Sequence, residues 1–183
     1  MSQTAVTPKN IVLIGFMGSG KSTVGRELHQ RLGYPLIDTD RSIEESTGKK
    51  ITEIFKEEGE AVFRDLETSK LVEIEKQADK RQIVSTGGGV VIRPENRSLL
   101  RKIGYVVWLQ VPEDVVYERT SRNQERPLLN HMDARERISK LLAEREPWYR
   151  ETAHLKIDTA GLDFKEIATG ILESARYHFT HSE

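Results

Sequence analysis

The stretch Gly-Phe-Met-Gly-Ser-Gly-Lys-Ser at residues 15–22 decides the fold. It matches the pattern G-x-x-x-x-G-K-[ST], follows the apolar run IVLI and precedes a segment whose apolar residues recur at helical spacing. Glycines let backbone N–H groups point at phosphate oxygens, and the N-terminus of the following helix adds a favourable dipole. A glycine-rich turn before a helix is the alternative, but here the full motif stands in the context that it requires. The stretch therefore predicts a loop that binds a purine nucleoside triphosphate.

The same loop predicts how the phosphates and a metal ion are held. Lys21 is expected to reach the β- and γ-phosphates, and the Ser22 hydroxyl is expected to ligate Mg²⁺. The residues predicted to surround the nucleotide phosphates are Gly18, Ser19, Gly20, Lys21, Ser22 and Thr23. Mg²⁺ is therefore the expected cofactor.

Composition indicates a soluble, cytoplasmic, single-domain protein. The chain has 183 residues, 37% hydrophobic and 31% charged, which suits one soluble domain with a sizeable core. Its formal net charge is -1, so no general basic field favours nucleic acid, and anions must be bound by locally placed arginines. The absence of cysteine excludes disulfides and thiolate metal sites and suits a reducing cytosol. We find no signal-peptide core and no apolar run near the ~20 residues that span a bilayer, and we expect a monomer.

Short apolar runs alternate with longer helical patterns, which predicts an α/β fold with a parallel sheet. None of the runs alternates strictly with polar residues, as expected of strands that are covered on both faces. The runs lie at 11–15, 34–38, 82–87, 105–111 and 154–158. The gap between the second and third runs is too long for one crossover helix, so we expect a helical insertion at about residues 40–80. A second irregular stretch at 121–133 is charged and is broken by Pro127. We expect one domain with two appendages.

Two classes of nucleotide-binding protein fit the loop: a switch driven by hydrolysis and a small-molecule kinase. The stretch Asp-Thr-Ala-Gly at 158–161 resembles the D-x-x-G with which small GTPases sense the γ-phosphate. However, it follows the fifth run, and the sequence has no N-K-x-D motif to read guanine. We interpret it as a strand that ends in a glycine turn. The two appendages favour a kinase, because a kinase closes over both substrates to keep water from the γ-phosphate.

The second apolar run ends in Asp38-Thr39-Asp40. In an extended segment, residues two apart face the same side, so the two carboxylates are expected to converge. Like charges at close range need a cation or hydrogen-bond donors, and beside a phosphate loop Mg²⁺ and a substrate hydroxyl are the candidates. The alternative is that Asp40 merely caps the N-terminus of the following helix.

Four further stretches carry candidates for binding an acceptor. Arg64 follows Phe63 within the insertion, although a lone arginine on a helix is usually solvated. Three glycines at 87–89 end the third run and allow a close approach of backbone to a ligand, with a loose turn as the alternative. Arg126 begins the run Arg-Pro-Leu-Leu in the second irregular stretch. Arg145 continues an apolar helix face, so it either snorkels to the rim or points at an anion in the cleft.

Together these motifs resemble the shikimate kinase family over about residues 10–160. They occur in the order of that family: the phosphate loop, D-x-D, F-R, G-G-G, R-P-L-L and a final R-x-x-x-Y-x-x-x-A that begins at Arg145. Each motif after the first is weak alone, but five in order are hard to obtain by chance. The resemblance implies a three-layer P-loop fold like that of nucleoside monophosphate kinases, with a five-stranded parallel sheet. It also implies that the insertion at 40–80 binds shikimate and that residues 119–133 form a mobile lid.

The resemblance further implies transfer of the γ-phosphoryl group of ATP to the 3-hydroxyl of shikimate. Lys21, Asp40 and Arg126 would be catalytic, with Asp40 on the ring hydroxyls and Arg126 entering from the lid onto the phosphates. Arg119 would lie near the adenine, whereas no contact at 158–162 can be assigned. The metal would be held by Ser22 and Asp38. The residues implied around shikimate are Asp40, Phe55, Phe63, Arg64, Gly87, Gly88, Gly89 and Arg145.

The chemistry of these residues suits a small carboxylate acceptor. Shikimate carries one carboxylate and three hydroxyls, so its site needs arginines that bind carboxylate in a bidentate manner and a carboxylate that accepts hydroxyl protons. Arg64, Arg145 and Asp40 supply that set. A nucleotide acceptor would instead call for aromatic stacking and more arginines. Two alternatives stay open: another small-molecule kinase such as gluconate kinase, and a nucleotide-binding module without transfer activity.

Overall fold

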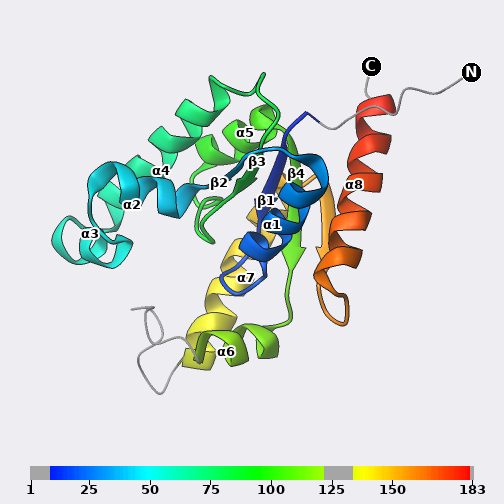
Figure 1. Cartoon of the computed structure of the whole chain (residues 1–183). Coiled ribbons are helices and arrows are strands. Elements are labelled where there is room, and N and C mark those ends of the chain that lie inside the picture. The colour runs from blue at the N-terminus through cyan, green and yellow to red at the C-terminus, as the bar shows by residue number, and fades with distance from the viewer. Residues whose placement is uncertain (1–8, 122–133, 182–183) are drawn as a thin grey trace, which may run out of the picture.

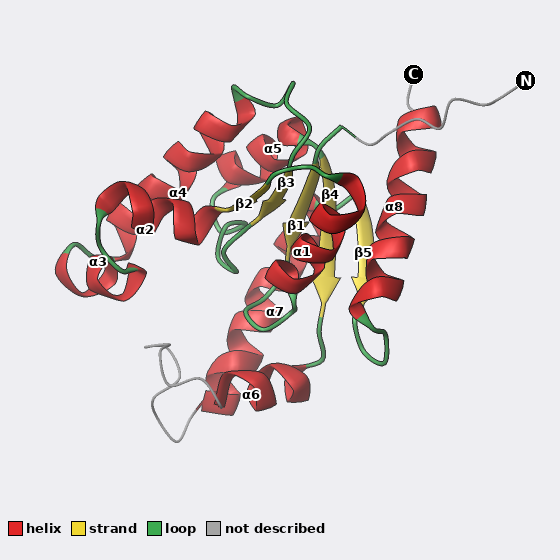
Figure 2. Cartoon of the chain, viewed as in Figure 1, coloured by secondary structure: helices red, strands yellow, loops and turns green. Residues whose placement is uncertain are grey.

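The computed structural model describes residues 9–121 and 134–181 of the chain. Its centre is a five-stranded parallel sheet in the order β2-β3-β1-β4-β5, with helices on both faces (Figures 1 and 2). The strands are β1 (Ile11–Ile14), β2 (Leu36–Asp38), β3 (Ile83–Ser85), β4 (Tyr105–Gln110) and β5 (Leu155–Asp158). Each of the five predicted runs contains one strand, so the predicted α/β fold with a parallel sheet is confirmed.

Eight helices surround the sheet in the described part of the chain. They are α1 (Lys21–Leu32), α2 (Thr39–Thr47), α3 (Ile51–Glu57), α4 (Glu60–Glu75), α5 (Pro94–Ile103), α6 (Glu113–Ser121), α7 (Ala134–Thr152) and α8 (Phe164–His181). The segment between β2 and β3 folds into α2, α3 and α4, which extend from the β2 edge in Figure 1. None of the described helices combines the length and the apolar composition that crossing a bilayer requires.

Side chains of the central strand alternate between two cores. Ile11 and Leu13 pack with residues of α1 and α8 on one face of the sheet. Val12 and Ile14 pack with residues of α4, α5 and α7 on the other face. All four side chains are fully buried. Because neighbouring residues of a strand point to opposite faces and both faces are covered, β1 is apolar along its whole length.

The carboxyl ends of β1, β2 and β3 meet at one edge of the sheet. Leu13 pairs with Ser85, and Asp38 of β2 pairs with the same residue of β3. The phosphate loop, Asp38 and the glycines at 87–89 leave these neighbouring strands, so the topology brings the predicted motifs together. Ligands of open α/β sheets commonly bind at this edge.

The opposite edge, at the amino ends of the strands, is held by Asn10. Its side chain is almost fully buried, and Nδ2 donates hydrogen bonds to the carbonyl oxygens of Ala78 at 2.7 Å and Ile103 at 2.8 Å. Its Oδ1 accepts a hydrogen bond from the backbone N–H of Gln82 at 3.0 Å. One side chain therefore ties the starts of β1 and β3 to the end of α5.

Aromatic rings fill the rest of this amino edge. The Tyr105 ring lies 5.4 Å from the His154 ring and 4.9 Å from the His178 ring, measured between centroids. The backbone N–H of Val106 donates to His154 Nδ1 at 2.9 Å. Burial, followed by the nearby Arg101 and His178, lowers the pKa of His154 to about 4. His154 is therefore neutral in the folded protein at neutral pH.

Candidate active site

Three glycines shape the loop between β1 and α1. Gly15, Gly18 and Gly20 have φ angles of 143°, 76° and 91°, which other residues rarely adopt. A Cβ atom on Gly15 would lie 2.5 Å from the carbonyl oxygen of Leu109, so the loop also passes very close to β4. Lys21 Nζ donates a hydrogen bond to the Gly15 carbonyl oxygen at 2.8 Å. The motif thus forms a tight loop with its lysine lying over it.

A cavity of about 390 Å³ opens at the carboxyl edge of the sheet beside this loop. Its walls come from the phosphate loop, the ends of β2 and β3, α6 and the start of α8. The lining residues are Met17, Gly18, Gly20, Lys21, Ser22, Thr23, Asp38, Asp40, Ser85, Thr86, Gly87, Gly88, Arg119 and Phe164. Most residues predicted for nucleotide and metal therefore meet at one cavity, while Ser19 is buried and accepts a bond from Lys21 Nζ at 3.3 Å.

Arg119 and Phe164 frame the cavity next to the phosphate loop. Arg119 donates a hydrogen bond to the Gly18 carbonyl oxygen at 2.6 Å. Phe164 is 39% exposed, and a Cβ atom on Gly20 would lie 3.0 Å from its ring. A guanidinium group and an exposed aromatic ring can both stack on a planar base. Phe164 was missed by the sequence analysis, and its only signal is an aromatic residue at a helix start.

Ser22 and Asp38 provide a pair of oxygen ligands in the cavity. Ser22 Oγ lies 3.4 Å from Asp38 Oδ2. Within residues 9–121 and 134–181, no cluster of three or more His, Cys, Asp and Glu side chains is placed to hold a metal ion. Mg²⁺ suits such a site because it commonly takes one or two protein oxygens and completes its shell with water and phosphate oxygens. The pair therefore fits the predicted ion.

The conformation around Asp38 and Asp40 differs from the predicted extended segment, and that prediction is wrong. Helix α2 begins at Thr39, directly after β2, and Asp38 is its N-cap. Asp38 Oδ1 accepts a hydrogen bond from the backbone N–H of Arg41 at 3.1 Å. Asp40 therefore lies in the first helical turn, where a negative charge is favourable. The cap is Asp38 rather than Asp40, yet both residues line the cavity.

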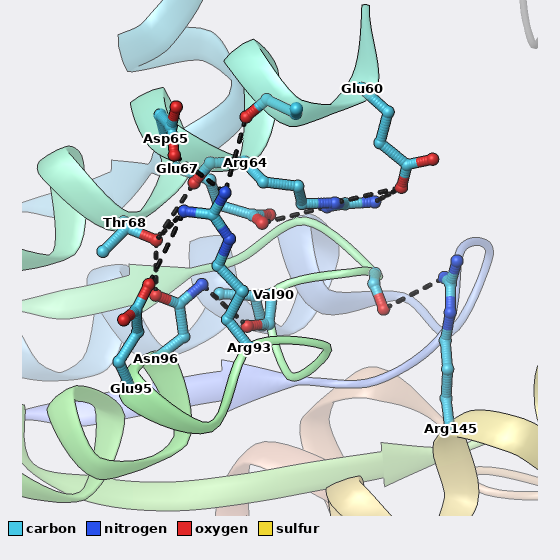
Figure 3. Close-up of polar contacts among 12 residues, drawn as sticks. Glu60, Arg64, Asp65, Glu67, Thr68, Val90, Arg93, Glu95, Asn96 and Arg145 are labelled. Carbon is cyan, nitrogen blue, oxygen red and sulfur yellow. Dashed lines mark hydrogen bonds and ion pairs between the residues drawn. The ribbon is translucent and has the colours of Figure 1, made fainter.

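Arg64 is the centre of a buried ionic cluster on α4 (Figure 3). Its NH1 group donates to Glu67 Oε2 at 2.9 Å, and its NH2 group donates to Glu60 Oε1 at 3.0 Å. The side chain of Glu67 is fully buried, whereas that of Glu60 is 60% exposed. The interaction with Glu67 is thus the one that water does not screen. Arg64 is held in place rather than solvated.

Glu67 is a functional candidate that the sequence analysis missed. Burial raises its pKa to about 7; Arg64 opposes this shift and Asp40 adds to it. Within the described residues its Oε1 has no hydrogen-bond partner. A Cβ atom on Gly87 would lie 3.1 Å from Glu67 Oε1 and 2.7 Å from Asp40 Oδ1, so both carboxylates border this glycine. A glutamate three residues after an arginine is common on exposed helices, so the sequence carried no signal of its burial.

The glycines at 87–89 bring backbone against charged side chains. A Cβ atom on Gly89 would lie 2.4 Å from Arg64 NH2. Arg145 NH1 donates to the Gly88 carbonyl oxygen at 3.3 Å, and the hydroxyl of Tyr149 donates to the same oxygen. The alternative of a loose turn is therefore excluded, because two side chains of α7 bond to this backbone and Arg64 of α4 lies against it.

Arg145 approaches the glycines from α7, opposite Arg64 on α4 (Figure 3). Its guanidinium carbon lies 5.6 Å from the centroid of the Phe16 ring, and the residue is 6% exposed. It therefore points inward rather than to the rim. Neither arginine lines the cavity itself; both contact the glycine segment that closes one side of it.

Phe55 and Phe63 are not placed at the cavity. Their ring centroids lie 4.9 Å apart, and they pack with Ile43 and Ile54 in a small core among α2, α3 and α4. Phe63 also lies under Arg64, with 5.2 Å between the guanidinium carbon and the ring centroid. Arg126, predicted to lie over the phosphates, is outside the described residues.

Several known proteins with similar sequences or structures are described as shikimate kinases. A family model described as shikimate kinase matches residues 17–176. The shikimate kinase of Thermodesulfovibrio yellowstonii is 46% identical over 165 residues, which cover 90% of this chain and 94% of that protein. The structure of shikimate kinase from Acinetobacter baumannii in complex with shikimate matches with a TM-score of 0.86 at 40% identity, covering 92% of this chain and 93% of that one. For shikimate kinase from Aquifex aeolicus the TM-score is 0.80 at 34% identity, with 95% and 99% covered.

Proposed function

The chain belongs to the shikimate kinase family, and we propose that its cavity transfers the γ-phosphoryl group of ATP to the 3-hydroxyl of shikimate. The observation that carries this proposal is the placement of a phosphate loop and a glycine segment held by Arg145 and bordered by Arg64 at the same edge of the sheet. The match to the shikimate kinase family model favours this function over the three alternatives from the sequence: a gluconate kinase, a switch driven by hydrolysis and a non-catalytic module.

The phosphate loop, Arg119 and Phe164 form the donor side of the proposed site. Backbone N–H groups of the loop and Lys21 bind the phosphates, while Arg119 and Phe164 stack on the adenine. Ser22 and Asp38 would hold Mg²⁺, which when bound neutralises charge on the phosphate oxygens. The resemblance adds Arg126, from outside the described residues, as a further cation on the phosphates.

Arg64 and Arg145 form the acceptor side. Two guanidinium groups that approach one glycine segment from opposite helices can bind a carboxylate between them. Because residues 87–89 lack side chains, the acceptor can lie directly against the backbone. Phe63 supports Arg64 from below through its ring, and Phe55 supports Phe63. The insertion at 40–80 thus supplies Arg64 and Asp40 to the acceptor side, and the segment 87–89 and Arg145 of α7 complete it.

Asp40 lies between the two sides. It lines the cavity together with Lys21 and Gly87, so a hydroxyl bound to its carboxylate would face the γ-phosphate. The reaction is a direct in-line transfer, in which positioning and charge stabilisation supply most of the rate. Asp40 orients the acceptor hydroxyl and takes its proton as the new P–O bond forms and the bond to ADP breaks.

The test is ADP release from ATP and Mg²⁺ with shikimate, gluconate, a nucleoside monophosphate or no acceptor. We expect release to require shikimate, with shikimate 3-phosphate as the product by mass spectrometry. Release of ADP that requires another acceptor would still support ATP binding at the phosphate loop, but it would contradict the roles of Arg64 and Arg145. Release without any acceptor would contradict kinase activity altogether.

We also propose that the enzyme is a cytoplasmic monomer; the lid expected at about residues 119–133 lies mostly outside the described residues. The full sequence contains no cysteine, which suits a reducing compartment, and one chain supplies both sides of the site. Light scattering coupled to gel filtration tests the monomer. A dimer would contradict it without affecting the assigned chemistry.

A further inference from the structure

Asn96 is a fully buried polar residue of α5 that contacts neither side of the proposed site directly (Figure 3). Its Nδ2 donates a hydrogen bond to the Val90 carbonyl oxygen at 3.0 Å. Its Oδ1 accepts one from the Thr68 hydroxyl at 2.8 Å. The amide has one orientation, because a flipped amide would set its oxygen against the Val90 oxygen. Asn96 thus joins the segment after the glycines to α4.

Both hydrogen-bond partners of Asn96 lie next to residues of the proposed acceptor site. Val90 directly follows Gly89, which lies against the Arg64 guanidinium group. Thr68 lies one helical turn after Arg64, and its hydroxyl is 3.0 Å from the Arg64 carbonyl oxygen. A shift of either partner therefore changes the spacing between Arg64 and the glycine backbone.

Arg93 makes a second connection between the same elements. Its NH2 group pairs with Asp65 Oδ1 at 2.7 Å, and its NH1 group donates to the Thr68 hydroxyl at 3.3 Å. The Asp65 side chain is 70% exposed, so this ion pair is screened by water and contributes little. The bonds of Asn96 are buried and hold the connection more firmly, because unmaking them leaves buried polar groups without partners.

We propose that Asn96 is a positioning residue for the acceptor site, because its amide sets the register between Arg64 and the glycine backbone. The inference rests on the proposed binding of the shikimate carboxylate between Arg64 and Arg145, against the segment 87–89. The amide of Asn96 bonds to Thr68 and Val90 and not to the phosphate loop, so ATP binding is independent of it. Affinity for the acceptor is thus controlled by a side chain that touches neither substrate.

The test compares steady-state kinetics of N96A and T68V with the wild type. For N96A we expect the KM for shikimate to rise about 5- to 20-fold, with kcat and the KM for ATP within about twofold. For T68V, which removes one hydroxyl at nearly constant volume, we expect a smaller rise of about 2- to 5-fold. Calorimetric binding of shikimate to the free enzyme checks that KM follows affinity.

Asn10 offers a matched control, because it is equally buried and hydrogen-bonded at the opposite edge of the sheet. N10A is expected to lower Tm as much as N96A without changing the KM for shikimate. If N96A lowered Tm but left that KM unchanged, Asn96 would have a structural role alone and the proposal would be overturned. Equal rises in N96A of the KM for shikimate and the KM for ATP would overturn the proposal as well.

A double-mutant cycle tests whether the two residues act through one connection. N96A/T68V is expected to match N96A alone, whereas additive effects would overturn the shared connection. Should N96A fail to fold, T68V decides, and an unchanged shikimate KM in T68V overturns the proposal. A wild type inactive with shikimate would contradict the proposed function. The inference alone would be contradicted if the wild type were active and R145A raised the KM for shikimate, while N96A and T68V left this KM unchanged.

Discussion

The two ends of the parallel sheet both hold buried polar residues, and Asn10 at the amino edge and Glu67 at the carboxyl edge differ in how fully they are hydrogen-bonded. Gln82 Nε2 at the amino edge also has no hydrogen-bond partner among the described residues. At the amino edge, Asn10 uses both amide hydrogens and its oxygen in hydrogen bonds, and His154 is kept neutral. At the carboxyl edge, Glu67 is buried with one oxygen that has no hydrogen-bond partner in the described part of the chain. Satisfied polar groups stabilise a fold, whereas an unsatisfied buried group costs stability and is retained where a site uses it. Because the cavity opens at the carboxyl edge, we expect binding there and a structural role for Asn10 at the amino edge.

The largest effect is expected from Lys21→Ala at the carboxyl edge. Loss of the cation over the phosphates removes stabilisation of charge in the transition state, and kcat is expected to fall about 10²- to 10³-fold. The measurement is turnover at saturating ATP and shikimate. Lys102, an exposed residue at the end of α5, is the control, and K102A is expected to keep wild-type kcat. Wild-type turnover in K21A would contradict the assignment of catalysis to the carboxyl edge.

Arg145→Ala is expected to have the next largest effect, on acceptor affinity. A charged hydrogen-bonded contact to a carboxylate contributes about 2–3 kcal/mol, so the KM for shikimate is expected to rise about 30- to 150-fold. The KM for ATP is expected to change far less. Arg150 on the same helix is exposed and pairs with Glu146, so R150A is the control and should behave as the wild type. Unchanged shikimate affinity in R145A would show that the carboxylate binds elsewhere.

A smaller effect is expected from the titration of Glu67. Because burial raises its pKa from 4.5 to about 7, the folded protein keeps this proton between those values while the unfolded chain loses it. Glu67 therefore lowers stability as pH rises through this window. Ionised Glu67 also competes with the shikimate carboxylate for Arg64, so the KM for shikimate is expected to rise by up to about tenfold as pH passes 7.

The E67Q variant separates this titration from other pH effects. Its absolute KM can differ from that of the wild type because Arg64 loses an ionic partner, but its KM is expected to be flat across pH 7. The ratio of wild-type to E67Q KM values, measured against pH, is the decisive quantity. A constant ratio would mean that Glu67 does not titrate in this range.

Sequence patterns predicted the strands and the loop because both depend on local chemistry. Strands covered on both faces are apolar throughout, as Ile11–Ile14 shows, and the glycines of the loop are required by its backbone angles. The conformation at Asp38 could not be predicted in this way. The residue that caps α2 depends on where β2 stops pairing with β3, and Asp38 is the last paired residue. Sequence offered two aspartates with equal capping ability and no means to choose between them.

Residues whose roles come from burial were missed. Thr68 and Asn96 have ordinary helical surroundings in sequence and bond to each other only when α4 and α5 pack together. Glu67 pairs with Arg64 on its own helix, and its role comes from the burial of that pair. Tyr149 was noted as part of a motif, but its bond to the Gly88 carbonyl oxygen depends on the position of α7. Such contacts join residues far apart in sequence, so no local pattern reports them.

The smallest effect on function is expected at the amino edge, from His154→Asn. The folded protein binds a proton at His154 with a pKa of about 4, whereas the ordinary value is 6.5. As pH falls below 6.5, the unfolded chain takes up this proton and the folded state does not, so the contribution of His154 to stability is lost toward pH 4. The Tm of the wild type is therefore expected to fall more steeply than that of H154N between pH 6.5 and 4.5, measured by calorimetry. At pH 7.5 both proteins are expected to have the same kcat and KM values, because the histidine lies at the edge opposite the cavity. A changed shikimate KM in H154N at neutral pH would show that the two edges are coupled, and the division between stability and binding would then fail.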